Sequence, residues 1–165
     1  MRAANIAHGD LQHGNVMADD AGNLTFIDLG GVWVPAIDGR PLSEFGHPNF
    51  QHPDRTEGKQ WGLHIDWFSA LVIWVSLRAL AADPILWRYN DENLIFKRKD
   101  FRGATGVWND LKQNPDEDVR AMMKVLAAVC EANPMTATDL NELLNTREAP
   151  GGSASTTSSG APTKT

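Results

Sequence analysis

Three polar residues near the start of the chain have the types and the spacing of a hard-oxygen site. Asp10 and Asn15 lie five residues apart in a glycine-containing segment, residues 8–15, of sequence HGDLQHGN. Asp28 follows thirteen residues after Asn15 and precedes Leu-Gly-Gly. Carboxylate and amide oxygens suit Mg²⁺, which binds one or two carboxylates together with substrate phosphates. A further carboxylate nearby can orient a hydroxyl or a water for phosphoryl transfer. The pattern favours magnesium-dependent phosphoryl chemistry, and an ordinary turn before a hairpin is the competing interpretation.

A small hairpin is predicted to bring these residues together. Residues 15–18 and 24–27 are short β-prone runs, and the turn-forming residues 19–23, Asp-Asp-Ala-Gly-Asn, separate them. Asn15 begins the first run and Asp28 follows the second. Because the strands of a hairpin run side by side, we expect the amide and the carboxylate to converge from its two sides.

Five ordered motifs resemble those of the protein kinase superfamily, over roughly residues 5–147. Residues 8–15 are similar to the kinase catalytic loop, and Ile-Asp-Leu-Gly at residues 27–30 is similar to the Asp-Phe-Gly magnesium motif. Residues 46–54, GHPNFQHPD, align with the Gly-Thr-Pro-x-Tyr-x-Ala-Pro-Glu close of a kinase activation segment. Residues 66–69 resemble the start of the kinase F helix, and residues 130–144 resemble the end of the C-lobe. Ordered motifs at consistent spacing are far more specific than any one of them.

The resemblance implies a chemical role for four matching residues. Asp10 is implied to be the catalytic carboxylate, which accepts or orients the proton of the substrate hydroxyl. Asn15 and Asp28 are implied to hold the Mg²⁺ ions that bridge the phosphates of ATP. Gln12 stands where Ser/Thr kinases place a Lys that contacts the γ-phosphate, and it is taken as a further cofactor-binding residue.

Three further residues, His8, Asp54 and Asp66, are implied to be structural. An acid at the start of so apolar a helix is costly unless it is hydrogen-bonded. In kinases the acid matching Asp66 accepts backbone N–H groups of the catalytic loop. The alternative for Asp66 is a simple N-cap of its own helix. Asp54 replaces the usual Glu of the family, and Ala137 falls near the place of that residue's Arg partner.

Other departures from the kinase pattern bear on activity. Gly9 replaces the usual Arg, so no cation at this position can grip a phosphate on the activation segment. Ser43 is the only hydroxyl side chain between Asp28 and Asp54, which leads to the hypothesis that no activation-loop phosphoswitch exists. His47 stands in place of Thr. With a neutral Gln12 the transition state loses a positive charge, so we expect slow or altered phosphotransfer.

The predicted fold is mainly α, in the α+β class: a protein-kinase-like C-terminal lobe with one small β-hairpin and no N-lobe. Residues 1–147 are assigned to this lobe and the low-complexity residues 148–165 to a disordered tail. Helices are predicted from apolar periodicity over 64–82 and 118–132, from a mixed pattern over 91–101, and from a capping pattern over 138–146. Residues 30–55, rich in Gly and Pro, are predicted to lack regular structure.

Composition narrows the range of partners and compartments. The 165 residues carry a formal net charge of −6, which argues against binding to nucleic acid. The apolar run 67–82 has 16 residues and contains Arg78, so it is too short for a membrane span. The single cysteine, Cys130, excludes an internal disulfide and fits a reducing, cytoplasmic location; on its apolar helix face it is expected to be inert.

The resemblance implies ATP-dependent phosphoryl transfer to Ser or Thr of a protein, with ATP and Mg²⁺ as cofactors. No G-x-G-x-x-G motif occurs, so the isolated chain is predicted to be inactive without a partner lobe. Two alternatives stay open. One is a pseudokinase lobe that acts as a protein-interaction module, and the other is a relative of small-molecule (aminoglycoside-type) phosphotransferases. A catalytic loop with Gly after His fits this last family as well, but residues 46–54 argue against it.

Overall fold

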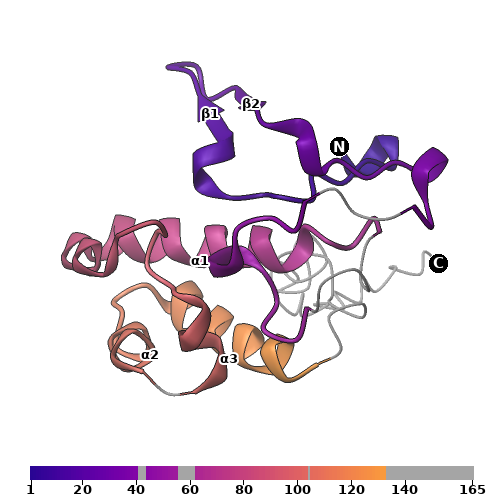
Figure 1. Cartoon of the computed structure of the whole chain (residues 1–165). Coiled ribbons are helices and arrows are strands. Elements are labelled where there is room, and N and C mark those ends of the chain that lie inside the picture. Colours follow the sequence, from indigo (N-terminus) through magenta and orange to yellow (C-terminus); the bar gives the residue numbers. More distant parts are fainter. Residues whose placement is uncertain (41–43, 56–61, 104, 133–165) are drawn as a thin grey trace, which may run out of the picture.

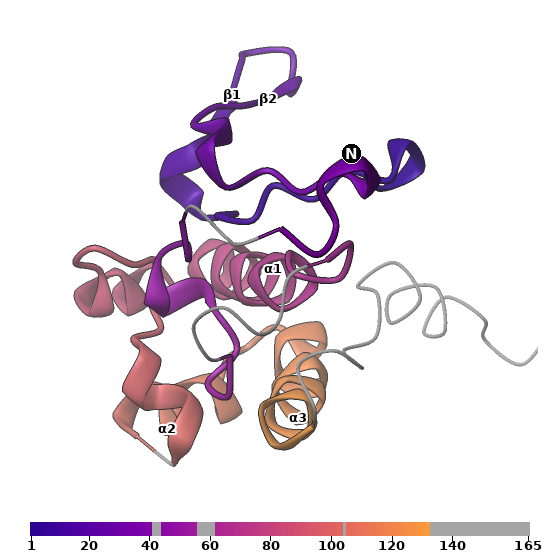
Figure 2. The ribbon, with the colours of Figure 1, turned by 45° about the vertical axis from the view of Figure 1, so that its right-hand side comes forward.

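The computed structural model describes residues 1–40, 44–55, 62–103 and 105–132. Within these residues the chain is mainly helical with one small antiparallel sheet of two strands, so the predicted α+β class is confirmed (Figure 1). The α-helices and strands are β1 (Val16–Ala18), β2 (Leu24–Phe26), α1 (Trp67–Ala82), α2 (Gly106–Lys112) and α3 (Glu117–Glu131). The hairpin lies on one side of α1, and α2 and α3 lie on the other (Figures 1 and 2).

Helix α1 is the centre of the core. Its sequence is apolar almost all round, as expected of a helix that is covered on several sides. Buried residues include Leu71, Val72 and Val75, and the helix packs against α3 and the 3-10 turn Pro84–Tyr89. The predicted start at residue 64 is wrong by three residues. Residues 62–67 form a tighter turn instead, in which the N–H groups of Ile65 and Trp67 donate to carbonyls three residues earlier.

Helix α3 agrees with its prediction to within one residue at each end. Asp116 caps it, because the side chain accepts hydrogen bonds from the N–H groups of Asp118 and Val119. Its apolar face is buried and consists of Val119, Met122, Met123, Leu126, Val129 and Cys130. This face packs against α1 and α2 and completes the core.

Helix α2 was not predicted from the sequence. It has seven residues, too few for a period of 3.6 to stand out. It is held by burial of Val107, Trp108 and Leu111, and the Trp108 indole N–H donates to the Asp100 carbonyl at 2.5 Å. The helix predicted over 91–101 is wrong, because this stretch contains only the start of the 3-10 turn Arg98–Arg102.

The hairpin formed by β1 and β2 was predicted, and it is confirmed. Val16 pairs with Phe26 and Ala18 pairs with Leu24. Asp19 closes the turn, because its carboxylate accepts hydrogen bonds from the N–H groups of Ala21 and Asn23. The strands are short and largely exposed.

Residues 30–40 and 44–55 contain no α-helix or strand, as predicted. They form 3-10 turns at Leu29–Gly31, Pro35–Ile37 and Pro48–Phe50. The predicted helix over 138–146, the tail 148–165, Ser43 and Ala137 lie outside the described residues. Among the described residues no helix is both long and apolar enough to cross a membrane.

Candidate functional site

The carboxylate of Asp66 anchors loop 8–15 from the side of the core. Its Oδ2 accepts a hydrogen bond from the His8 N–H at 2.5 Å, and its Oδ1 accepts one from the Gly9 N–H at 2.9 Å. Asp66 precedes α1, yet its side chain makes no capping hydrogen bond to that helix. The contact that the resemblance implied is therefore present, and the simple N-cap interpretation is wrong.

Two opposing effects act on the Asp66 carboxyl. Burial raises its pKa above the ordinary value, because removal of water disfavours the charged form. The N–H groups of His8 and Gly9 oppose this rise, as does the positive charge of Arg55. A hydrogen bond to a charged acceptor contributes about 1.5–3 kcal/mol. These contacts therefore compensate for the cost of burying an aspartate behind the loop.

Loop 8–15 packs backbone to backbone against residues 31–33. Ala7 and Trp33 form an antiparallel bridge, with N to O distances of 3.1 and 2.9 Å. Gly9 next to this bridge has φ +80°, and a Cβ atom there would lie 1.9 Å from the Gly31 carbonyl oxygen. The close approach excludes any side chain at position 9. It gives a steric reason for Gly at the place where kinases have Arg.

Asp10 is held by three hydrogen-bond donors. Its Oδ1 accepts from the His47 N–H at 2.6 Å. Its Oδ2 accepts from Gln12 Nε2 at 3.0 Å and from Asn15 Nδ2 at 3.2 Å. The structure thus brings Asp10, Gln12 and Asn15 into one cluster and joins it to segment 46–54. The Gln12 side chain thus orients Asp10. The spacing of these residues in the sequence did not indicate this contact.

Asn15 lies beside the residues that lead to Asp28. Its carbonyl oxygen accepts a hydrogen bond from the Ile27 N–H at 3.0 Å, which continues the hairpin ladder. Asp28 then turns away in the left-handed region, with φ 57° and ψ 68°. Its side chain is exposed and makes no capping hydrogen bond to the turn that follows. Asn15 therefore lies across the hairpin from Ile27, the neighbour of Asp28, and the convergence of the Asn15 and Asp28 side chains stays a prediction.

Asn15 and Asp28 carry the types of oxygen atom that could hold a magnesium ion. Asn15 Nδ2 donates to both the carbonyl and the carboxylate of Asp10, so Asn15 Oδ1 is the amide atom that faces no internal donor among the described residues. The Asp28 side chain is exposed. The described residues contain no group of three His, Cys, Asp or Glu side chains that could hold a metal. One carboxylate and one amide match Mg²⁺, which completes its shell with water and phosphate oxygens.

His8 ties the loop to the strand before Asp28. The side chain is fully buried, and its Nε2 lies 2.9 Å from the Ile27 carbonyl oxygen. Because a carbonyl only accepts, this nitrogen carries the proton of the imidazole. His8 thus contacts Asp66 through its backbone and residue 27 through its ring, which is consistent with a structural role.

Segment 46–54 is fixed to the core by buried side chains. Phe50 is buried, and the Ser69 hydroxyl of α1 donates to its carbonyl at 2.6 Å. His52 is also buried: its Nε2 lies 2.7 Å from the Val129 carbonyl of α3, and its Nδ1 accepts from the Asp54 N–H. Burial lowers the pKa of His52 below its ordinary value, so the ring is neutral at physiological pH.

Asp54 has an ion-pair partner that the sequence did not reveal. Its Oδ1 lies 2.5 Å from Arg102 Nη2, which comes from the 3-10 turn Arg98–Arg102. Both side chains are about half exposed, at 45% and 59%. Such a pair contributes about 0–1 kcal/mol. No local pattern could have identified Arg102, because it lies 48 residues away in the chain.

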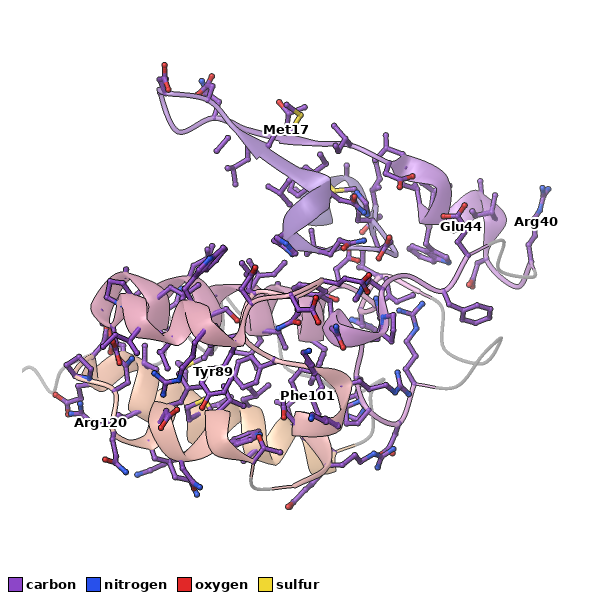
Figure 3. All side chains as sticks on the ribbon, turned by 60° about the vertical axis from the view of Figure 1, so that its left-hand side comes forward. Met17, Arg40, Glu44, Tyr89, Phe101 and Arg120 are labelled. Carbon is purple, nitrogen blue, oxygen red and sulfur yellow. The ribbon has the colours of Figure 1, made fainter. Side chains whose placement is uncertain are left out.

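A cavity formed by described residues lies away from loop 8–15. It has a volume of about 810 Å³ and lies between α2, α3 and the turn Arg98–Arg102, where the chain buries Phe101 (Figure 3). Phe101, Trp108 and Met123 form its apolar side, while Lys112 and Lys124 add positive charge. Asp54 and Arg102 also line this cavity, whereas Asp10, Gln12, Asn15 and Asp28 do not.

Comparison with known proteins supports a kinase-like relationship. The chain is 34% identical over 65 residues to a protein of Dictyostelium discoideum named "Probable serine/threonine-protein kinase mkcD". The match covers 39% of this chain and 10% of that protein, so the chain spans a small part of the relative's length. No protein-family model matches the chain. The similarity supports a kinase-like relationship and nothing finer.

Proposed function

We propose that this chain is the lower lobe of a kinase-like domain and that it binds the phosphates of Mg-ATP for transfer to a Ser or Thr hydroxyl of a protein. One observation supports this most: Asp10, Gln12 and Asn15 form a single hydrogen-bonded cluster beside the residues leading to Asp28. Asp66 anchors that cluster to the core. The 34% identity to a serine/threonine kinase favours the same class of reaction.

The residues of the cluster and Asp28 would each have a different role in such a transfer. Asp10 would accept the proton of the attacking hydroxyl, with its Oδ1 held by the His47 N–H so that the carboxylate keeps one orientation. Asn15 and Asp28 would hold Mg²⁺. When bound, this ion neutralises charge that develops on the phosphate oxygens. Gln12 orients Asp10 and adds no positive charge, so the transition state is stabilised less than it would be by a lysine.

The chain by itself is expected to transfer phosphate very slowly or not at all. Residues 1–165 contain no G-x-G-x-x-G motif that could cover the phosphates. A second lobe would have to supply this part of the nucleotide site. In the proposal the lower lobe therefore provides the metal ligands and Asp10, and it becomes active only with its partner lobe.

A paramagnetic metal tests the metal ligands without requiring turnover. Mn²⁺ takes the same oxygen ligands as Mg²⁺, and it broadens the amide resonances of nearby residues. Mn²⁺ with ATP is added to the ¹⁵N-labelled chain and to two variants, Asp28→Asn and Asp20→Asn. Asp20 is an exposed aspartate of the hairpin turn, so its variant is a matched control for the loss of one negative charge.

We expect broadening centred on residues 10–16 and 27–31 in the parent chain and in Asp20→Asn. The broadening should be strongly reduced in Asp28→Asn, because a ligand is missing. Equal broadening in both variants, or broadening centred on the turn 19–23, contradicts the assignment of Asn15 and Asp28. Rapid phosphorylation of a Ser/Thr peptide by the isolated chain would contradict the need for a second lobe.

A second candidate function is that of a binding lobe without catalysis. It is favoured by large apolar side chains that lie exposed on the hairpin and the turn after it: Met17, Leu24, Phe26, Ile27 and Leu29. Figure 3 shows Met17 on the hairpin, on the side away from α1. An apolar surface of this kind is typical of a protein contact. A binding lobe has no need of nucleotide, so absence of any Mn²⁺-ATP effect on the spectrum favours it.

A further inference from the structure

Arg55, just after segment 46–54, is a buried cation behind loop 8–15. Its side chain is only 9% exposed. It is the only Lys or Arg that is buried among the residues that the structure describes. Burial of a charge is costly unless an opposite charge lies near it. A permanent charge at this position therefore calls for a specific reason.

Gln51 accepts a hydrogen bond from the Arg55 guanidinium and lies close to loop 8–15, although its Nε2 has no hydrogen-bond partner among the described residues. Arg55 Nη1 donates to Gln51 Oε1. The other end of the same amide, Nε2, lies near Gly46, where the Gly9 carbonyl and Asp10 Oδ1 also converge. Nε and Nη2 of Arg55 have no hydrogen-bond partner among the described residues. Hydrogen bonds alone therefore do not compensate for the cost of burying this guanidinium.

Two carboxylates supply the compensation through their charge. Burial lowers the pKa of Arg55 to about 10, and the negative charges of Asp66 and Asp10 oppose that fall. At neutral pH the guanidinium is therefore charged. The positive charge of Arg55 in turn opposes the rise that burial causes in the pKa of Asp66.

We propose that Arg55 is a positioning residue for loop 8–15: its guanidinium, buried behind the loop and bonded to Gln51, compensates the buried Asp66 carboxylate that anchors the loop. Gly9 cannot carry a cation, because its Cβ would meet the Gly31 carbonyl, so Arg55 supplies the charge from the opposite segment. The role of Arg55 in positioning a catalytic loop rests on the proposed phosphoryl transfer. The effect of the Arg55 charge on Asp66 is independent of that function, and the experiment measures this effect.

The experiment follows the ionisation of Asp66 in the full 165-residue chain. Aspartate side chains are labelled with ¹³C, and the carboxyl of Asp66 is titrated by NMR in the parent chain, Arg55→Gln, Arg55→Lys and Arg40→Gln. Arg40 is exposed and projects from the segment after the turn Pro35–Ile37, so its variant controls for loss of one charge (Figure 3). The amide proton shift of Gly9 is recorded in parallel, because this N–H donates to Asp66.

We expect Arg55→Gln to increase the proton affinity of Asp66 about tenfold, as loss of an opposite charge at short range does. Protonation should then move the Gly9 amide resonance at a higher pH than in the parent chain. Arg55→Lys should restore most of the parent behaviour, and Arg40→Gln should not differ from it. An unchanged Asp66 titration in folded Arg55→Gln overturns the proposal and leaves Arg55 a packing role.

If Arg55→Gln does not fold at neutral pH, its helical signal is followed as the pH is lowered. The charged groups facing Arg55 are Asp66 and Asp10, and His8 faces Asp66 and is unchanged in every variant. The proposal expects recovery of helix as Asp66 is protonated, with Arg55→Lys folded at neutral pH. A variant that is unfolded at every pH, or Arg55→Lys as unstable as Arg55→Gln, overturns it. Neither result depends on ATP, so a failed Mn²⁺ experiment leaves this one intact.

Discussion

Replacement of Gly9 by Ala tests whether loop 8–15 and residues 31–33 pack as tightly as the structure shows. Gly9 has φ +80°, and an added Cβ would lie 1.9 Å from the Gly31 carbonyl oxygen. Gly22 in the hairpin turn has nearly the same backbone angle, φ +81°, and an added Cβ there meets no atom within 4 Å. The two substitutions share the backbone strain and differ only in the steric clash.

The structure sets the size of each effect. A non-glycine residue in the left-handed region costs about 1–2 kcal/mol, which is the whole loss expected for Gly22→Ala. At Gly9 the clash with backbone adds about 1–3 kcal/mol of overpacking. Because the distance is so short, we expect the energetic cost of the clash to lie at the upper end of this range. The free energy of unfolding of Gly9→Ala should therefore be lower by about 3–5 kcal/mol in total. That is a large part of the roughly 5–15 kcal/mol stability of a small protein.

Urea unfolding followed by far-UV circular dichroism measures both variants. With a slope of about 1.5 kcal/mol per M, the midpoint should fall by at least about 2 M for Gly9→Ala and by about 1 M for Gly22→Ala. The Mn²⁺ broadening of residues 10–16 should also be lost in Gly9→Ala, because displacement of Gly31 moves the loop after Asp28. Equal losses of stability in the two variants would refute the close packing at Gly9.

Three other predictions concern the groups that hold the site. Asp66→Ala should lower the unfolding free energy by about 3–5 kcal/mol, because two buried N–H groups lose their acceptor and the buried Arg55 loses a nearby opposite charge; a loss below about 1 kcal/mol in urea unfolding contradicts the anchoring role. Burial lowers the pKa of His52, so the stability from its neutral ring is complete above an unfolded pKa of about 6.5 and is lost as the pH falls below it, by at most about 1.4 kcal/mol per pH unit. His52→Gln should flatten this part of the pH–stability curve, and an unchanged curve argues against a buried neutral ring. Burial raises the pKa of Cys130 to about 12. At about pH 8 the folded chain should therefore react with iodoacetamide more than about a thousandfold more slowly than a free cysteine does; rapid labelling without unfolding would show that Cys130 is accessible.

The local part of the fold could be predicted because it depends on neighbouring residues. The hairpin follows from β-prone runs around a turn. Helix α3, with 15 residues, follows from apolar residues at helical spacing, and Asp116 caps its start. Prediction failed where an element is short or where a nearby contact competes. Helix α2 shows no clear period in seven residues. The start of α1 shifted by three residues because residues 62–67 close a tight turn.

By itself, the sequence determined which residues are candidates for chemistry: Asp10, Asn15 and Asp28 at hairpin spacing, with Gln12 between the first two. Tertiary structure alone decided how these groups are held. Asp66 bonds to His8 and Gly9, which lie 58 and 57 residues away in the chain, and Arg102 pairs with Asp54 over 48 residues. Arg55 drew no attention in the sequence, because a single arginine outside any motif looks like a surface residue. Side-chain periodicity describes one segment at a time, whereas burial and charge compensation depend on which distant segments pack together.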